Sequence, residues 1–217
     1  MSNNPQLLFV AGAQRCGEID LFRSIVGTRC VIFDVDKVIA RIEAQSPDMP
    51  KKEVYQAATQ EFFNQVTEAV KQQQHFTLET NFRDYQLSDI VAEFKRHGYT
   101  TNMVYMTLEN IEQSIDRVNK RVLDGGHFVD HKNIKQNYDL GLQYLEHFAG
   151  RFDNLEIMDA SGPGRQLRSL LSIQHHKLEH LSDQLPERVA KTVNAIADRY
   201  QQRQNQKLRQ YRGPKPS

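Results

Sequence analysis

Apolar and polar positions alternate along the first three quarters of the chain in a way that predicts strands and helices in turn. Short apolar runs, typical of buried strands, fall at 6–11, 31–33, 76–78, 101–106 and 155–158. Between them, apolar residues recur every three or four positions, which predicts helices at 18–26, 38–44, 51–73, 85–97, 107–123 and 131–148. This alternation predicts an α/β fold with three layers, a doubly wound parallel sheet of five strands covered by helices.

The last quarter of the chain has a different pattern. Two helical stripes, separated by Pro186, predict helices at 165–184 and 187–211. After Tyr200 the chain is basic and rich in Gln with no acidic residue, which indicates a solvated helix end and tail. We therefore predict a domain at 1–164, a C-terminal helical extension at 165–211 and a tail at 212–217.

Composition changes this picture little. The 217 residues suffice for one substantial core, and 28 basic against 27 acidic residues leave almost no net charge. The overall field therefore favours no polyanionic partner, and nucleic acid is not expected; docking of nucleic acid or protein on the basic C-terminal part is a weaker alternative. Two cysteines, no signal-like start and no apolar run of spanning length predict a cytoplasmic protein without a membrane segment.

A glycine-punctuated loop follows the first predicted strand. The Walker frame G-x-x-x-x-G-K-[ST] cradles phosphates with backbone N–H groups, neutralises them with Lys and holds Mg²⁺ with the hydroxyl. Gly12 and Gly17 have this separation, but Glu18 stands in place of the Lys and Ile19 in place of the hydroxyl. Taken alone, the loop is as typical of an ordinary strand-to-helix turn as of a phosphate site.

Polar residues follow the second and third predicted strands, at the edge where ligands of open α/β sheets bind. They are Asp34, Asp36, Glu79 and Thr80. A phosphotransferase needs a donor loop, a carboxylate for the acceptor hydroxyl and basic groups for the migrating phosphoryl. The order of these residues in the chain is compatible with that set.

From about Leu7 to Gly162 the sequence resembles the zeta-toxin family of P-loop kinases, whose best-known members use ATP to phosphorylate UDP-N-acetylglucosamine. The most specific resemblance lies at 117–138, where Arg117, Arg121, the Gly125-Gly126-His127 turn, Val129, Ile134 and Tyr138 have the family's spacing. The segment 76–80 is similar to the family's Phe-x-x-Glu-Thr. Asp36 falls at the family's catalytic Asp.

On the acceptor side, the resemblance implies that Asp36 is the base for the acceptor hydroxyl and that Asp34, Glu79 and Thr80 bind the sugar-nucleotide. Each residue has a plainer alternative: Asp36 as the N-cap of the following helix, and Glu79 and Thr80 as a polar strand end. His127 either orients its turn or the substrate, or makes a structural hydrogen bond.

On the donor side, the resemblance implies contact with the nucleotide for Gly12, Arg15, Gly17, Glu18, Arg117 and Arg121. For the two last arginines a solvated or ion-paired helix face is the alternative. No metal site is predicted from the residues: His175, His176 and His180 lack a completing pattern and are expected on a solvated helix face.

Three groups that handle ATP charge in the family are replaced, by Glu18, Ile19 and Asn137. A unit charge pair about 4 Å apart contributes roughly 4 kcal/mol at an effective dielectric near 20, and reversing one sign changes this by up to about twice as much. We therefore predict a kinase fold with impaired or absent ATP turnover that acts by binding a sugar-nucleotide or a protein partner such as an antitoxin.

The alternative is an active phosphotransferase with a rearranged donor site. It would require ATP and Mg²⁺, with Asp34, Asp36 or Asp20 holding the metal and Arg15, Arg117 or Arg121 binding the phosphates. Arg15 and Arg23 are the cations near the loop that could replace the missing Lys. The sequence leaves the cofactor undetermined.

Overall fold

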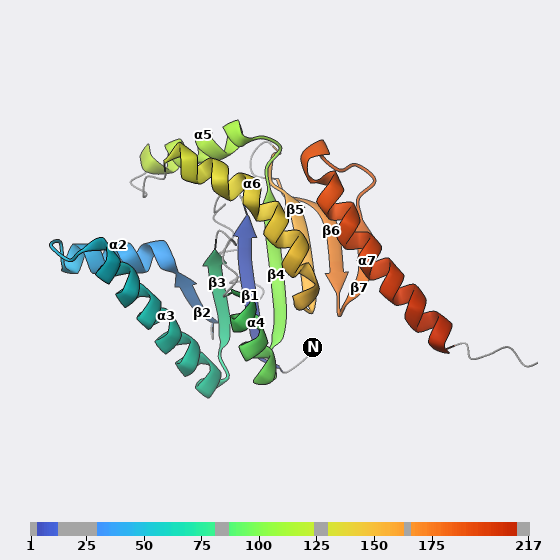
Figure 1. The fold of residues 1–217 in the computed structure, drawn as a ribbon, viewed down its shortest axis with the longest axis horizontal. Helices are drawn as coiled ribbons and strands as arrows, with labels where there is room; N and C mark the ends of the chain where they lie inside the picture. Colours follow the sequence, from blue (N-terminus) through green and yellow to red (C-terminus); the bar gives the residue numbers. More distant parts are fainter. Residues whose placement is uncertain (1–3, 13–29, 81–86, 124–129, 163–165, 212–217) are drawn as a thin grey trace, which may run out of the picture.

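The computed structural model describes residues 4–12, 30–80, 87–123, 130–162 and 166–211, except for the side chains of residues 121 and 207–211. These residues form one central sheet with helices packed against it (Figure 1). The sheet has seven strands in the order β2-β3-β1-β4-β5-β6-β7.

The five predicted strands are all present within two residues of their expected bounds. They pair in parallel and comprise β1 (Gln6–Gly12), β2 (Cys30–Asp34), β3 (His75–Thr80), β4 (Thr100–Thr107) and β5 (Asn154–Asp159). The expectation of a five-stranded, wholly parallel sheet is wrong, because two antiparallel strands extend it beyond β5.

These additional strands, β6 (Arg168–Gln174) and β7 (Lys177–Leu181), replace the helix predicted at 165–184. The leucine spacing in this segment fits a helix, but Leu171 and Ile173 pair with Ile157 and Leu155 of β5 in an antiparallel ladder. His175 and His176 between the strands have φ values of 49° and 61°. Two successive residues with positive φ make a tight hairpin turn and end any helix, so these histidines do not lie on a helix face.

Six α-helices are described: α2 (Val35–Gln45), α3 (Lys51–Gln72), α4 (Leu87–Arg96), α5 (Ile111–Leu123), α6 (His131–Phe148) and α7 (Glu187–Tyr211). A short 3-10 turn, η1 (Ala149–Arg151), follows α6. The predicted helix at 18–26 lies outside the described residues. No described helix has both the length and the apolar character needed to cross a bilayer.

The main core lies between one face of the sheet and α3, α4, α6 and α7. Phe9, Phe62, Phe76, Phe94 and Tyr200 are almost fully buried there. Burial of one such side chain stabilises the fold by roughly 1.5 to 3 kcal/mol. A smaller apolar cluster, with Leu8, Val10, Val104 and Met106 at its centre, covers the opposite face.

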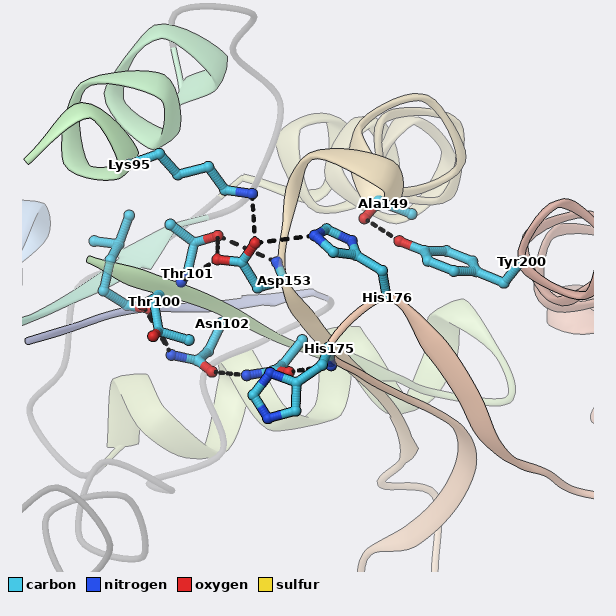
Figure 2. Close-up of polar contacts among 11 residues, drawn as sticks. Lys95, Thr100, Thr101, Asn102, Ala149, Asp153, His175, His176 and Tyr200 are labelled. Atoms are coloured by element: carbon cyan, nitrogen blue, oxygen red, sulfur yellow. Dashed lines mark hydrogen bonds and ion pairs between the residues drawn. The ribbon is translucent and has the colours of Figure 1, made fainter. Parts of the chain in front are cut away.

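At the edge where β4 and β5 begin, Asp153 is the centre of a polar network (Figure 2). Its carboxylate accepts hydrogen bonds from Lys95 Nζ at 2.7 Å and from the Thr101 backbone N–H at 2.8 Å and hydroxyl at 2.9 Å. His176 Nε2, from the β6–β7 turn, lies 3.0 Å from the same carboxylate. The network joins α4, β4, β5 and the added hairpin.

The C-terminal helix α7 packs along α6 and the hairpin (Figure 1). Tyr200 donates a hydrogen bond to the Ala149 carbonyl at 3.1 Å, and Arg199 pairs with Glu146 at 2.7 Å. Beyond Tyr200 the described side chains of α7 are polar and mostly exposed. The solvated helix end expected from the sequence is therefore present.

Candidate functional site

Four predicted site residues meet at the edge of the sheet where the parallel strands end. Gly12 ends β1, Asp34 ends β2, and Glu79 and Thr80 end β3. Asp34 pairs in register with Glu79, and Ala11 of β1 pairs with Thr80. The expected juxtaposition is observed, while the roles of these residues remain predictions.

Gly12 is required here by the backbone. Its φ is +123°, and a Cβ at this position would lie 1.9 Å from the Met106 carbonyl oxygen of β4. Only glycine permits both the conformation and this close approach. The glycine predicted from the phosphate-loop frame is therefore needed to let β1 end against β4.

The helix cap at this edge is Asp34, and the alternative assignment of the N-cap to Asp36 is wrong. Asp34 Oδ1 accepts hydrogen bonds from the backbone N–H groups of Asp36 at 3.1 Å and Lys37 at 3.3 Å. Because α2 follows β2 without a loop, the last residue of the strand has the extended backbone that a cap needs. Asp36 lies in the first turn of the helix, where the helix dipole favours its negative charge.

Asp34 and Glu79 form a pair of buried acids. Each is 7% exposed, and their positions in register on parallel strands place both side chains on the same face of the sheet. Buried carboxylates accept strong hydrogen bonds from hydroxyl and amide groups. Asp34 Oδ2 also pairs with Lys37 Nζ at 3.4 Å. Glu79 is therefore the acid that suits the uncharged part of a ligand.

A pocket of about 220 Å³ opens beside Glu79, under α3 and α4. Glu79 and Thr80 contribute its polar part, and its apolar walls include Tyr55, Phe62 and Ile90. These three wall residues were not predicted as site residues from the sequence. Tyr55 is 59% exposed, and a large aromatic outside the core stripe of a helix is the signal that could have pointed to it.

Arg117, on the donor side, donates a hydrogen bond from its guanidinium to the Ala160 carbonyl just after β5. Asp159, at the end of β5, accepts hydrogen bonds from the Ser161 N–H at 2.9 Å and from the Arg168 guanidinium at 2.9 Å. Burial raises the pKa of Asp159, but these hydrogen bonds outweigh it and hold the pKa below its usual value. The end of β5 thus has a fixed arrangement of two cations, Arg117 and Arg168, and one anion, Asp159.

Asn137 stands where the resembling family usually carries Arg. Its side-chain oxygen is buried and has no hydrogen-bond partner among the described residues, as is also true of Gln113 Oε1 on α5. An uncharged amide therefore occupies this position. Together with Glu18 and Ile19 in the loop, it makes the residues present a poor fit for ATP and Mg²⁺.

Arg188, at the start of α7, was not predicted from the sequence either. Its guanidinium carbon lies 3.3 Å from the centre of the Tyr138 ring, and the group donates to the Tyr138 carbonyl and, at 3.4 Å, to the Thr107 hydroxyl. Burial lowers the pKa of Arg188. The residue joins α7 to α6 and to the end of β4, and a single Arg after Pro186 gives no signal of this in the sequence.

Several predicted residues lie outside the described part of the chain: Arg15, Gly17, Glu18 and His127. Arg121 belongs to α5, but its side chain is outside the description. Within the described ranges, His, Cys, Asp and Glu side chains form no group of three that could hold a metal ion.

No protein-family model matches the chain. An uncharacterised protein of Haemophilus influenzae (strain ATCC 51907 / DSM 11121 / KW20 / Rd) is 23% identical over 108 residues, which cover 50% of this chain and 74% of that protein.

Solved structures are similar over most of the chain. A chain in the PezAT chromosomal toxin-antitoxin system of Streptococcus pneumoniae matches with a TM-score of 0.59 and 14% identity, covering 93% of this chain and 88% of that one. A chain of the AvrRxo1-ORF1:AvrRxo1-ORF2 crystal structure with sulphate ions matches with a TM-score of 0.62 and 13% identity, covering 91% and 76%. The chain therefore has the same fold as these two chains, and the likeness concerns the fold alone.

Proposed function

We propose that this protein binds a sugar-nucleotide of the UDP-N-acetylglucosamine kind at the carboxyl ends of β2 and β3, and that its ATP-dependent phosphoryl transfer is impaired or lost. The observation that carries the proposal is the pocket at the end of β3. It combines an apolar wall with two polar residues, Glu79 and Thr80, at one end. This is the usual composition of a site for a polar ring, with few polar groups placed on an apolar surface.

The size of the pocket indicates how much of the ligand it holds. Whole small-molecule sites commonly measure about 300 to 1,000 Å³. The 220 Å³ enclosed by described residues therefore fits one ring of a sugar-nucleotide. Glu79 supplies acceptors for hydroxyl and amide groups and disfavours phosphate, so the sugar is the part expected beside Glu79, with the diphosphate directed away from it.

The donor side supports the second half of the proposal. Glu18 places a negative charge where the Walker frame has a positive one, Ile19 removes the hydroxyl ligand for Mg²⁺, and Asn137 is uncharged. Replacing a cation by an anion changes the interaction by up to about twice the energy of one charge pair at an effective dielectric near 20. Half of this change weakens ATP binding or slows phosphoryl transfer by several hundredfold.

A protein partner is the second part of the proposal. PezAT is a toxin-antitoxin system, and AvrRxo1-ORF1 was crystallised with AvrRxo1-ORF2. Proteins of this fold thus occur in complexes with a second protein, which supports a protein partner for this chain as well.

The test is calorimetry with UDP-N-acetylglucosamine and with ATP–Mg²⁺ in separate titrations. We expect binding of the sugar-nucleotide and no binding of ATP–Mg²⁺. Thr80→Val and Glu79→Gln should weaken sugar-nucleotide binding by about tenfold, because each removes one polar contact of roughly 1.4 kcal/mol. Thr100→Val, at the opposite end of the sheet, is the matched control and should bind like the original chain.

Two results would overturn the proposal. Equal affinities of Thr80→Val, Glu79→Gln and Thr100→Val for UDP-N-acetylglucosamine would place the ligand elsewhere. Phosphate transfer from ATP at rates typical of kinases, about 1 to 100 per second, would show an active phosphotransferase. In that case Asp36→Asn should abolish the transfer.

A further inference from the structure

Helix α3 has two apolar stripes, and the sheet covers one of them. The inner stripe is buried and comprises Val54, Ala58, Phe62, Val66 and Ala69. The second stripe includes Tyr55, Phe63 and Val70, and Phe63 is 48% exposed. A helix with an additional exposed aromatic face commonly binds another molecule there.

The second stripe forms one wall of a groove between α3 and α4. The groove has a volume of about 1020 Å³, and its apolar surface consists of Phe63, Val66, Val70 and Ile90. Phe63 and Ile90 also line the pocket of the proposed ligand site, so the groove begins at that pocket. From Phe63 to Lys71, which also lines the groove, α3 rises about 12 Å, which is slightly more than two helical turns.

Helices α3 and α4, which form the two walls of the groove, run in the same direction. Tyr99, just after α4, places its hydroxyl 2.9 Å from the Ala69 carbonyl and 2.8 Å from the Gln74 carbonyl, both at the end of α3. The C-terminal ends of α3 and α4 therefore lie together, and both helices run down to the edge where β3 and β4 begin (Figure 1). The negative ends of both helix dipoles share one end of the groove.

The two ends of the groove carry different charged side chains. Lys71, Arg96 and His97 line the groove at the C-terminal end, where Glu93 pairs with Arg96 and His97. Asp89 lies in the first turn of α4, near the pocket. Within the described residues, Lys71 and Asp89 have no ion pair, so one positive and one negative side chain remain available at opposite ends.

We propose that this groove binds an amphipathic helix of a partner protein, antiparallel to α3 and α4, with an acidic residue in its first turn facing Lys71 and a basic residue in its last turn facing Asp89. The proposal rests on the protein-partner part of the proposed function and names its surface. Acidic first turns and basic last turns also suit the dipole of the bound helix itself. Aliphatic residues between them contact Phe63, Val70 and Ile90, in the manner of other helix-in-groove complexes.

Helix α7 of a second copy is a poor occupant. It has an acidic start and a basic end, but its apolar face packs against its own α6 and hairpin through Val189, Val193 and Ile196. Helices α3 and α4 also begin with an acidic residue and end with a basic one, but they are the walls of the groove itself. The charges at the two ends of the groove are therefore assigned to a helix of another protein.

The test is a display library of helical peptides of about 15 residues with a fixed leucine face and randomised first and last turns. Peptides are selected for binding to the full chain and against binding to the Val70→Asp variant. We expect recovered peptides to carry acidic first turns and basic last turns. The exchange Lys71→Glu with Asp89→Lys should invert this preference on reselection.

Binding of one recovered peptide then measures each contact. Phe63→Ala should weaken it by about 30-fold, as expected for an aromatic anchor, and Lys71→Glu by about two- to fivefold. Leu181→Ala removes an exposed apolar side chain on β7 and is the matched control, with unchanged affinity. Thermal unfolding of each variant establishes that it is folded.

No recovery of peptides, or peptides without the charge bias, would overturn the proposal. Self-association of the chain that Val70→Asp abolishes would identify a second copy as the occupant and would also overturn it. Thr80→Val should leave peptide affinity unchanged, and Val70→Asp should leave UDP-N-acetylglucosamine affinity unchanged. The failure of one binding function is therefore distinguishable from the failure of the other.

Discussion

Lys95 Nζ at the end of α4 lies 2.7 Å from Asp153 Oδ1, which directly precedes β5 (Figure 2). The two residues are 58 positions apart in the chain. Because the same carboxylate also accepts two hydrogen bonds from Thr101, one side chain joins a helix and two strands. This relationship fixes the edge of the sheet opposite the candidate site.

Asp153→Asn should therefore destabilise the protein by about 1 to 2 kcal/mol, measured by urea unfolding. The amide keeps the shape of the carboxylate but loses its charge and one acceptor. The expected loss of stability is small because the Lys95 and Asp153 side chains are partly exposed and water screens their ion pair. Asp48→Asn, at an exposed position without an ion pair among the described residues, should change stability by less than about 0.5 kcal/mol. Equal losses in the two variants would contradict this assignment.

The contribution of Asp153 should depend on pH. Burial raises the pKa of this carboxyl, but hydrogen bonds from Lys95 and Thr101 outweigh it and hold the pKa below 3.8 in the folded protein. A depressed folded pKa gives stability that is present above the unfolded value and is lost as pH falls through the folded value. The difference in unfolding free energy between the original chain and Asp153→Asn should thus be constant near neutral pH and shrink below about pH 4. A difference that grows on acidification would contradict the sign.

Gly12→Ala should be severely destabilising. The new Cβ would meet the Met106 carbonyl oxygen at 1.9 Å, and a backbone contact cannot be relieved by a change of rotamer. Gly98→Ala is the matched control, because Gly98 also has positive φ but a Cβ there would meet no atom within 4 Å. We expect about 1 kcal/mol for Gly98→Ala, the cost of the left-handed conformation, and more than about 4 kcal/mol for Gly12→Ala in chemical unfolding. Similar losses would show that the contact with Met106 is unimportant.

Asp34→Ala should cost about 1 kcal/mol of stability through loss of the cap of α2. Asp36→Ala removes only a favourable charge in the first turn and should cost about 0.5 kcal/mol or less. Urea unfolding of both variants measures the difference. A larger loss for Asp36→Ala would restore the assignment of the cap to that residue.

Arg188→Lys should loosen the start of α7 even though it keeps the charge. A lysine cannot stack a planar group on the Tyr138 ring while donating to two acceptors, so we expect a loss of about 1 to 2 kcal/mol. Hydrogen exchange in the first turns of α7 should accelerate accordingly. Arg203→Lys, whose guanidinium lies 5.7 Å from the Tyr200 ring on the exposed part of α7, is the control and should leave exchange unchanged.

Much of the fold could be predicted because its elements carry strong local signals. The apolar run of β1 and the stripe of Val54, Phe62 and Val66 in α3 each favour one structure. The β6–β7 hairpin could not be predicted, because its leucines fit the helical period and two histidines are an unusual pair for a tight turn. Its structure depends on pairing with β5, which is set by the sheet as a whole.

The candidate site also has residues that could be predicted from the sequence and residues that could not. Asp34, Glu79 and Thr80 could be located from the sequence, since the ends of parallel strands meet at one edge. The choice of Asp34 as the cap depends on β2 running directly into α2, and a shift of one or two residues in the strand end would have changed it. Tyr55 and Arg188 reach their sites from helices distant in the chain, so local patterns do not reveal them.

The sequence by itself determined the succession of strands and helices along the chain and the acids at the strand ends. It also placed Glu18 where the Walker frame has a lysine. Each of these features is a local choice of residue type. Only the tertiary structure decided that the sheet continues into an antiparallel hairpin, that Gly12 is needed against Met106, and that α3 and α4 leave a groove between them. These features arise from contacts between segments far apart in the chain. Their energies depend on packing geometry, which periodicity and composition do not contain.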